Sequence, residues 1–188
     1  MQLLLPFLLL LAVSPLAQAK DVDRAEYVRL AGEIRGLADR QAWSGVERAY
    51  QAALETEHPL SFRDHMSGAH AASASGDVAA VRERLFEAHQ IEEDRKVVEW
   101  LWSIDNDYGK VSVVSKRGAE LEAAKMPFDP ARAKAVRYAA QTLCETGEYA
   151  GMLPAGAYQV GEVVFVVTAG VEAPLVSATG KRRRKRAG

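Results

Sequence analysis

The sequence predicts an α+β protein in which an array of about five helices precedes a small β-rich domain with one inserted helix. Apolar residues recur at a spacing of 35 residues between positions 27 and 104, a period typical of stacked helical hairpins. After position 109 this spacing gives way to alternating β-branched residues, interrupted by a helix-like stretch over 130–146. We therefore expect the helical array over 20–107 and the β-rich domain over 108–175.

The aligned positions of the 35-residue period are apolar or aromatic in every copy. They are Tyr27, Phe62 and Val97; Ala31, Met66 and Leu101; Ile34, Ala69 and Ile104; Val46 and Val81; Tyr50 and Leu85; and Ala53 and Ala88. Within a copy they lie three or four residues apart, on one face of a helix, and such faces are buried only where neighbouring hairpins stack. Two hairpins and a closing helix make a short array, so we expect the C-terminal half to cover its open end.

Capping residues and helix breakers divide the array into its helices. A capping box at Asp23 opens the first helix, and Pro59 ends the second because proline offers no backbone N–H. Ser61 starts the third helix, and Gly76-Asp77 separates the third helix from the fourth. A polar turn over 105–109 is expected to connect the array to the β-rich domain.

One turn and the helix after it resemble a tetratricopeptide repeat. The stretch Gly76–Val81, followed by Leu85 and Ala88, is similar to the turn and second helix of such a repeat, and Trp100 stands where the family often has tryptophan. The first repeat departs from the pattern, with Gln41 in place of the turn glycine. The resemblance implies a non-enzymatic interaction protein that binds a peptide or another protein on the concave side of the array.

Three residues are candidates for ligand contact on that concave side. If the first helices of successive repeats line it, Arg35 and His70 lie one period apart, with Arg63 nearby. A basic pair of this kind could hold the carboxylate of a peptide tail through charge-assisted hydrogen bonds. The alternative is that these side chains are ordinary solvated surface residues.

The three tryptophans differ in their expected roles. Trp43 and Trp100 lie in the repeated region, and we expect them to pack between helices. Trp102 is two residues from Trp100, so it faces another side of the same helix. We therefore include Trp102 among the candidate contacts, either with the β-rich domain or with a partner.

The β-rich domain is predicted from short alternating segments separated by turn residues. Asp129 caps the inserted helix, with Pro130 at its first position, and Cys144 lies beside the apolar face of that helix. The segment 163–167 is apolar on both faces, which favours a central or covered strand. Strands are expected over 111–116, 121–123, 149–152, 157–160 and 163–167.

A short motif in this half resembles the small extracellular β-sandwich modules of the PEGA and carboxypeptidase-regulatory type. The motif is Leu153-Pro154-Ala155-Gly156-Ala157-Tyr158, with Arg117-Gly118-Ala119 as an earlier turn. The helix over 130–146 departs from that pattern, so a generic α+β domain is the alternative. Either way, about seventy residues bury only a modest core, and we expect this half to pack against the helices.

The first 19 residues have the pattern of a secretory signal peptide. They carry no charged side chain and contain an apolar run followed by Ala17-Gln18-Ala19, a small-x-small cleavage site ahead of Lys20. An uncleaved membrane anchor is the alternative. We expect a secreted or periplasmic protein whose mature chain begins near Lys20.

The charge is distributed unevenly along the chain. Six of the 24 basic residues lie in the tail, which leaves 18 against 25 acidic residues elsewhere. They are Lys181, Arg182, Arg183, Arg184, Lys185 and Arg186. We expect residues 176–188 to form a disordered basic tail, which either solubilises the chain or attaches it to an anionic polysaccharide, lipid or nucleic acid.

The side chains that usually carry chemistry do not form a catalytic constellation in this sequence. His65 and His70 lie five residues apart, which does not match the four-residue spacing of a zinc-binding helix. No histidine follows His89 to activate Cys144 locally, and no glycine-rich phosphate loop is present. We expect a non-enzymatic protein with no catalytic residue, metal or cofactor, and we leave its oligomeric state open.

Overall fold

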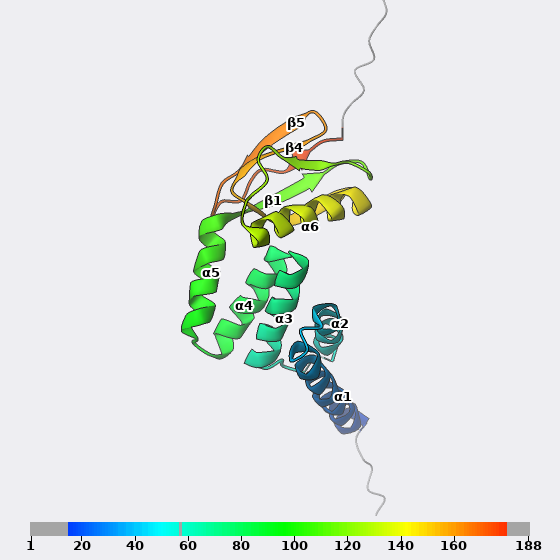
Figure 1. The fold of residues 1–188 in the computed structure, drawn as a ribbon. Coiled ribbons are helices and arrows are strands. Elements are labelled where there is room, and N and C mark those ends of the chain that lie inside the picture. Colours follow the sequence, from blue (N-terminus) through cyan, green and yellow to red (C-terminus); the bar gives the residue numbers. More distant parts are fainter. Residues whose placement is uncertain (1–14, 57, 180–188) are drawn as a thin grey trace, which may run out of the picture.

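The structure is a computed structural model that describes residues 15–56 and 58–179, and its fold is α+β as predicted. Figure 1 shows the helical array at one end and the strands at the other, with α6 lying between the strands and the array. In chain order the elements are α1 Pro15–Ala38, α2 Trp43–Leu54, α3 Phe62–Ser75, α4 Val78–Ile91, α5 Arg95–Asp107, β1 Tyr108–Val114, β2 Leu121–Ala123, α6 Pro130–Thr146, β3 Glu148–Pro154, β4 Gly156–Val160, β5 Val163–Val167 and β6 Val176–Ser177.

The 35-residue period predicts most of the core of the array, although the aligned set Ala31, Met66 and Leu101 is only half-buried. Ile34, Ala69 and Ile104 occupy one aligned position in α1, α3 and α5, and all three are buried. The paired positions on α2 and α4 are buried as well, including Tyr50 and Leu85. Each helix thus turns its repeated face toward its neighbours, which is how stacked hairpins bury apolar surface that a single hairpin would expose.

The predicted helix boundaries at α3 and α4 are confirmed. Ser61 and Asp64 form a reciprocal capping box at the start of α3, and Gly76 ends that helix in the left-handed conformation with φ of 96°. Asp77 then caps α4 by accepting a hydrogen bond from the N–H of Ala80 at 3.1 Å. A side chain at Gly76 would also meet the carbonyl oxygen of Lys134, so this glycine lets α6 approach the array.

Three predicted boundaries are wrong. Helix α2 ends at Leu54, before it reaches Pro59, which was expected to end it. Helix α1 begins at Pro15 and not at Asp23, because the residues between them include the strong helix formers leucine, alanine, glutamine and lysine. The expected polar turn over 105–109 is also wrong. Helix α5 continues to Asp107 and β1 starts at Tyr108, where the last turn of α5 is held by Arg82–Asp105 and Arg132–Asp107 ion pairs, each of 2.7 Å.

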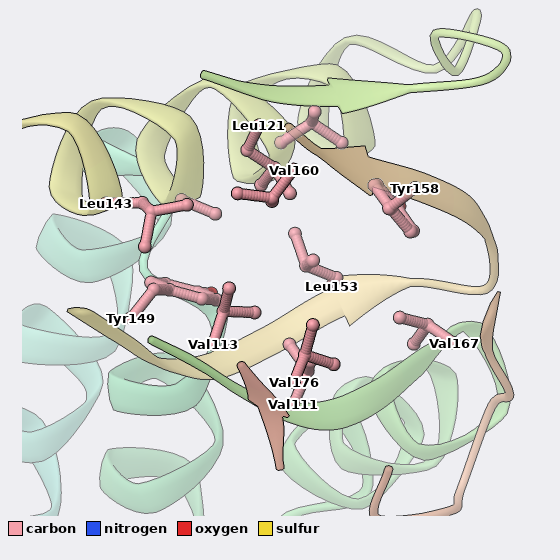
Figure 2. Packing of buried hydrophobic residues seen from close by; sticks show 12 residues of the cluster. Val111, Val113, Leu121, Leu143, Tyr149, Leu153, Tyr158, Val160, Val167 and Val176 are labelled. Atoms are coloured by element: carbon pink, nitrogen blue, oxygen red, sulfur yellow. The ribbon is translucent and has the colours of Figure 1, made fainter. Parts of the chain in front are cut away.

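The strands form two three-stranded sheets in the orders β3–β1–β6 and β2–β4–β5. Strand β1 pairs antiparallel with β3, with Val113 opposite Tyr149, and parallel with β6. Figure 2 shows Leu143 of α6 and Leu153 of β3 among the side chains that fill the space between the two sheets. The β half therefore has its own core, which α6 completes.

Residues at three places in the β half differ from the sequence prediction. Strand β5 lies at a sheet edge, whereas a central or covered strand is predicted there, because the chain after Val167 crosses to the other sheet. Its side chains Val164 and Val166 are 66% and 65% exposed. Cys144 is exposed, since it lies one residue beyond buried Leu143 and is rotated away from the apolar face of α6. Val176 and Ser177 form β6, whereas they were expected in the disordered tail.

The β half also shares a core with the helical array. Ala135 of α6 and Met152 of β3 are buried in the same cluster as Val81, Val97 and Ile104. This packing agrees with the expectation that the C-terminal half covers the end of a short array. Among the described residues, no helix combines the length and the apolar character needed to cross a membrane.

Replacing Tyr138 with phenylalanine should lower the free energy of unfolding by about 1 kcal/mol. The Tyr138 hydroxyl donates a hydrogen bond of 2.8 Å to Oδ2 of Asp77, which joins α6 to the turn before α4. Phenylalanine keeps the packed ring but leaves that carboxylate oxygen without this donor. Urea denaturation of the two proteins measures the difference, and equal midpoints would contradict the predicted contribution.

Candidate functional site

Three aromatic side chains from three helices form a row beside α3. The ring of His70 in α3 lies between Trp43, the first residue of α2, and Trp100 in α5. The ring centroids are 5.9 Å apart for Trp43 and His70 and 5.1 Å apart for His70 and Trp100, with interplanar angles of 33° and 41°. We call these three residues the aromatic row.

The aromatic row remains open to solvent. His70 is exposed although it has an indole on each side, and both indoles are only half-buried. Aromatic side chains that serve only to fill a core would be covered by other residues. The row therefore presents accessible ring surface on the helical array.

Two cavities lie beside the part of α3 that follows His70, one next to Trp43 and the other next to Trp100. The first has a volume of about 280 Å³ and is lined by Trp43, Ser44, Glu47, Ala71, Ala74 and Ser75. The second has a volume of about 200 Å³; Trp100 and Ser73 line it together with the start of α6, including Arg132. Helix α3 presents only alanine and serine to these cavities, so they stay open. We call the aromatic row and these two cavities the α3 groove.

Two acidic side chains of the α3 groove are paired with arginines, whereas Asp129, which also lines the second cavity, accepts a hydrogen bond of 2.8 Å from the backbone N–H of Arg132. Glu47 accepts hydrogen bonds of 2.6 and 2.7 Å from the guanidinium of Arg84, and Asp107 lies 2.7 Å from that of Arg132. Desolvation lowers the pKa of His70, so its imidazole is neutral at neutral pH. The groove thus combines aromatic surface with two ion pairs and the further carboxylate of Asp129.

A buried network lies behind this groove and joins α2, α3 and α4. The side chain of Arg84 is 7% exposed; besides Glu47, it donates to the carbonyl oxygen of Gly68 at 2.7 Å and lies 4.4 Å from the ring centroid of Tyr50. The Tyr50 hydroxyl is 3.0 Å from Nδ1 of buried His65. These contacts fix the position of the helices that carry Trp43 and His70.

The structure brings together some of the predicted contact residues but not all. His70 belongs to the α3 groove, whereas Arg35 is exposed in the last turn of α1, and its side chain forms no hydrogen bond or ion pair with another described residue. Arg63 lies 3.8 Å from Asp39. The lowered pKa of the His70 imidazole disfavours a second positive charge at this position at neutral pH.

The remaining predicted contacts lie elsewhere. Trp102 is 69% exposed on another side of α5 from Trp100, which agrees with its two-residue separation. The six basic residues of the tail, 181–186, lie outside the described residues. Among the residues that the structure describes, no three histidine, cysteine, aspartate or glutamate side chains are grouped so that they could hold a metal ion.

Sequence reasoning missed that Trp43 and Trp100 lie on either side of His70. The three residues come from different helices, so their spacing in the sequence gives no sign of the row. One signal was present, because the small-residue stretch Ala71–Ser75 follows His70 and indicates room beside this helix.

Comparison with known protein families, with curated proteins and with solved structures finds no match for this chain. The interpretation of the α3 groove therefore depends on its own residues and their geometry.

Acidification should destabilise the helical array. Desolvation lowers the pKa of His65 and of His70, so the unfolded chain binds more protons than the folded chain as pH falls through about 6.5. The free energy of unfolding should fall over that window and level off below the folded-state pKa values. Glu87 and Asp64 oppose the lowering at His65, and Arg84 adds to it.

Urea denaturation between pH 7.5 and pH 5 measures this dependence. A His65→Gln variant removes the more deeply buried of the two imidazoles, so its stability should vary less steeply with pH. If the variant and the wild type show the same slope, His65 is not a source of the pH dependence.

Proposed function

We propose that this protein is an exported, non-enzymatic interaction protein that binds an extended peptide segment in the α3 groove. The observation that carries the proposal is the solvent-accessible aromatic row of Trp43, His70 and Trp100, held in place by three separate helices. Export is inferred from the uncharged apolar segment that ends in Ala17-Gln18-Ala19.

The composition of the α3 groove suits a peptide ligand. Binding sites combine apolar and aromatic walls with a few polar groups, and tryptophan is enriched among residues that contribute most to protein interfaces. Here two indoles supply the apolar surface, while His70 and the serines of α3 supply polar groups. The cavities are open at the surface and follow a helix, which suits an elongated ligand better than a compact one.

Local geometry supports the resemblance of the helices to tetratricopeptide repeats and of the β half to a PEGA-type module. In a tetratricopeptide-like hairpin the helices are separated by a tight turn, and Gly76 supplies it with a left-handed backbone. In a PEGA-like module a Pro-x-Gly-x-Tyr strand closes the unit, and the Tyr158 hydroxyl donates to the carbonyl oxygen of Pro154 at 2.7 Å. We accordingly infer a short tetratricopeptide-like platform followed by a PEGA-like module.

Selection from a random peptide library displayed on phage, with the mature chain as bait, tests the proposed function. Selected peptides should bind the wild type, and a Trp43→Ala/Trp100→Ala variant should bind them at least about tenfold more weakly, as expected when central aromatic contacts are removed. Trp102→Ala is the matched control, because it removes an exposed tryptophan outside the groove. Equal binding by the double variant, or no selected peptide at all, would reject the proposal.

A second candidate function uses the basic tail. Residues 181–186 are all lysine or arginine, and such a run binds anionic polymers by neutralising their charge and releasing counterions. In this case the protein would attach to an anionic polysaccharide, lipid or nucleic acid. Deleting residues 181–188 should then abolish salt-sensitive binding to heparin or anionic vesicles, whereas unchanged binding would reject this candidate.

A further inference from the structure

We infer that strand β5 is the interface of a two-fold dimer, in which it pairs antiparallel with β5 of a second copy of this chain. The pairing is centred on Phe165, so that the sheet β2–β4–β5 continues from one copy into the other. This inference goes beyond the proposed function and does not depend on the α3 groove.

One edge of strand β5 makes no backbone pairing. In β4 the carbonyl oxygen of Ala157 accepts a hydrogen bond of 2.9 Å from the N–H of Ala124, on the side of β4 away from β5. Ala157 and Val166 are therefore a non-hydrogen-bonded pair, so the backbone groups of Val166, and of Val164 two residues before it, point away from β4. Neither residue has a backbone hydrogen bond to another segment of the described chain. Since burying unpaired N–H and C=O groups is costly, these groups face solvent.

The unpaired edge of β5 lacks the features that usually protect a sheet edge from another chain. Residues 163–167 include no charged residue and no proline, and the exposed side chains of Val164 and Val166 are apolar. The three other edge strands are protected, since β2 and β6 have only three and two residues and β3 packs against α6. An open, apolar edge of this kind favours pairing with another strand.

The sequence of β5 matches a second copy of the same strand. Residues 163–167 are Val-Val-Phe-Val-Val, which reads the same in both directions, and a two-fold axis pairs a strand with its own reverse. With Phe165 opposite its counterpart, Val164 of one copy lies opposite Val166 of the other. These are the residues whose backbone groups point away from β4, so each such pair can exchange both of its N–H···O bonds. A second copy therefore satisfies the whole open edge.

The side chains and the flanking residues fit the same register. Opposed residues lie on one face of a sheet, so Val164 packs beside Val166 of the second copy on the exposed face. Phe165 lies opposite its counterpart on the other face, and such aromatic cross-strand pairs are favourable. Glu162 falls opposite Thr168, so this register brings no like charges together. Figure 1 shows β5 at the end of the molecule away from α1 and α2, where a second copy can approach.

Sedimentation equilibrium of the full mature chain over a range of concentrations is the first test. We expect a monomer–dimer equilibrium without larger species, because a two-fold interface is closed. Val166→Pro removes only an N–H that points away from β4, and proline is tolerated at such edge positions. The variant should therefore fold, as far-UV circular dichroism shows, and dimerise at least about tenfold more weakly. Val166→Thr keeps this N–H and should dimerise more tightly than Val166→Pro.

A double variant keeps the test valid if Val166→Pro does not fold. Val164→Lys/Val166→Lys changes only exposed side chains, yet in the dimer it places each lysine directly opposite another. Like charges in this position are destabilising, so dimerisation should weaken at least about tenfold. Val28→Lys/Leu54→Lys is the matched control, because these exposed residues lie in α1 and α2 and should leave the dissociation constant unchanged.

Disulfide formation tests the register of the two strands. In a Cys144→Ser background, a chain with Val164→Cys should crosslink to a chain with Val166→Cys, because Cα atoms of a hydrogen-bonded pair lie about 5.5 Å apart, within the range of disulfides. Each chain alone should crosslink at least about fivefold less, since its cysteine and the same cysteine of a second copy are diagonal neighbours across the interface.

Three results would overturn this inference. The first is a chain that stays monomeric up to about 1 mM, including one whose β5 edge pairs with an added strand-forming peptide instead. The second is a dimer that neither Val166→Pro nor the double lysine variant weakens, because its interface would lie elsewhere. The third is association into open-ended species. None of these results bears on the α3 groove, which the peptide library tests separately.

Discussion

Replacing Glu47 with alanine should lower the free energy of unfolding by about 3 kcal/mol, the lower end of the range for breaking a buried ion pair. The side chain of Arg84 is 7% exposed and is held by Glu47 at 2.6 Å, so the substitution leaves a buried guanidinium without its counter-ion. The Glu47 side chain is 36% exposed, which is why the lower end of the range applies. Urea denaturation gives the value directly.

Two further variants separate this charge effect from simple loss of side-chain atoms. Glu47→Met combined with Arg84→Met replaces both charges with apolar side chains of similar length, and it should restore most of the lost stability. Arg29→Ala removes a partner from the exposed Glu26–Arg29 pair and should leave the midpoint unchanged. If Glu47→Ala were as mild as Arg29→Ala, the pairing of Arg84 with Glu47 would contribute little to the fold.

Gly109→Ala should destabilise the protein by about 3 kcal/mol, the upper end of the range for overpacking. This glycine follows Tyr108 at the start of β1, where a methyl group would meet backbone oxygens of Thr168 and Val171 and approach Cγ1 of Val167 to 2.8 Å. Because two of these neighbours are backbone atoms, the site cannot adjust by rotating a side chain.

Besides lowering the overall stability, Gly109→Ala should break hydrogen bonds close to the substitution. The N–H of Lys110 donates to the carbonyl of Val171, and the N–H of Gly170 donates to that of Tyr108, so displacing the 168–171 segment breaks both bonds. Gly32→Ala is the matched control, since no atom outside its own helix lies within 4 Å of the added carbon. That change should stabilise α1 by up to about 1 kcal/mol. Equal effects of the two substitutions in thermal denaturation would contradict the close packing at Gly109.

Much of the architecture could be predicted from local sequence. The 35-residue period identifies the buried faces of the array, because a helix shows its burial in a regular spacing of apolar residues. Ser61, Gly76 and Asp129 mark helix ends through chemistry that acts within a few residues: side-chain oxygens that accept from early N–H groups, and a glycine that takes up a left-handed backbone.

Other features depend on contacts between distant residues and so could not be predicted in this way. The segment 163–167 has the composition of a covered strand, yet its position at a sheet edge follows from where the chain goes next. Cys144 and Leu143 are neighbours in sequence, but only the packing of α6 against the sheets determines which of them is buried.

The same division applies to the candidate site. The sequence by itself determined that Arg35 and His70 are one period apart and that Trp43 and Trp100 belong to the helical array, because these statements need only helical spacing. Only the tertiary structure decided that His70 lies between two indoles and that Arg35 stands apart from them. The pairing of Glu47 with Arg84 across 37 residues likewise balances the charge of Glu47 in the groove. Such pairings depend on how the helices stack, so the periodicity within one helix does not predict them.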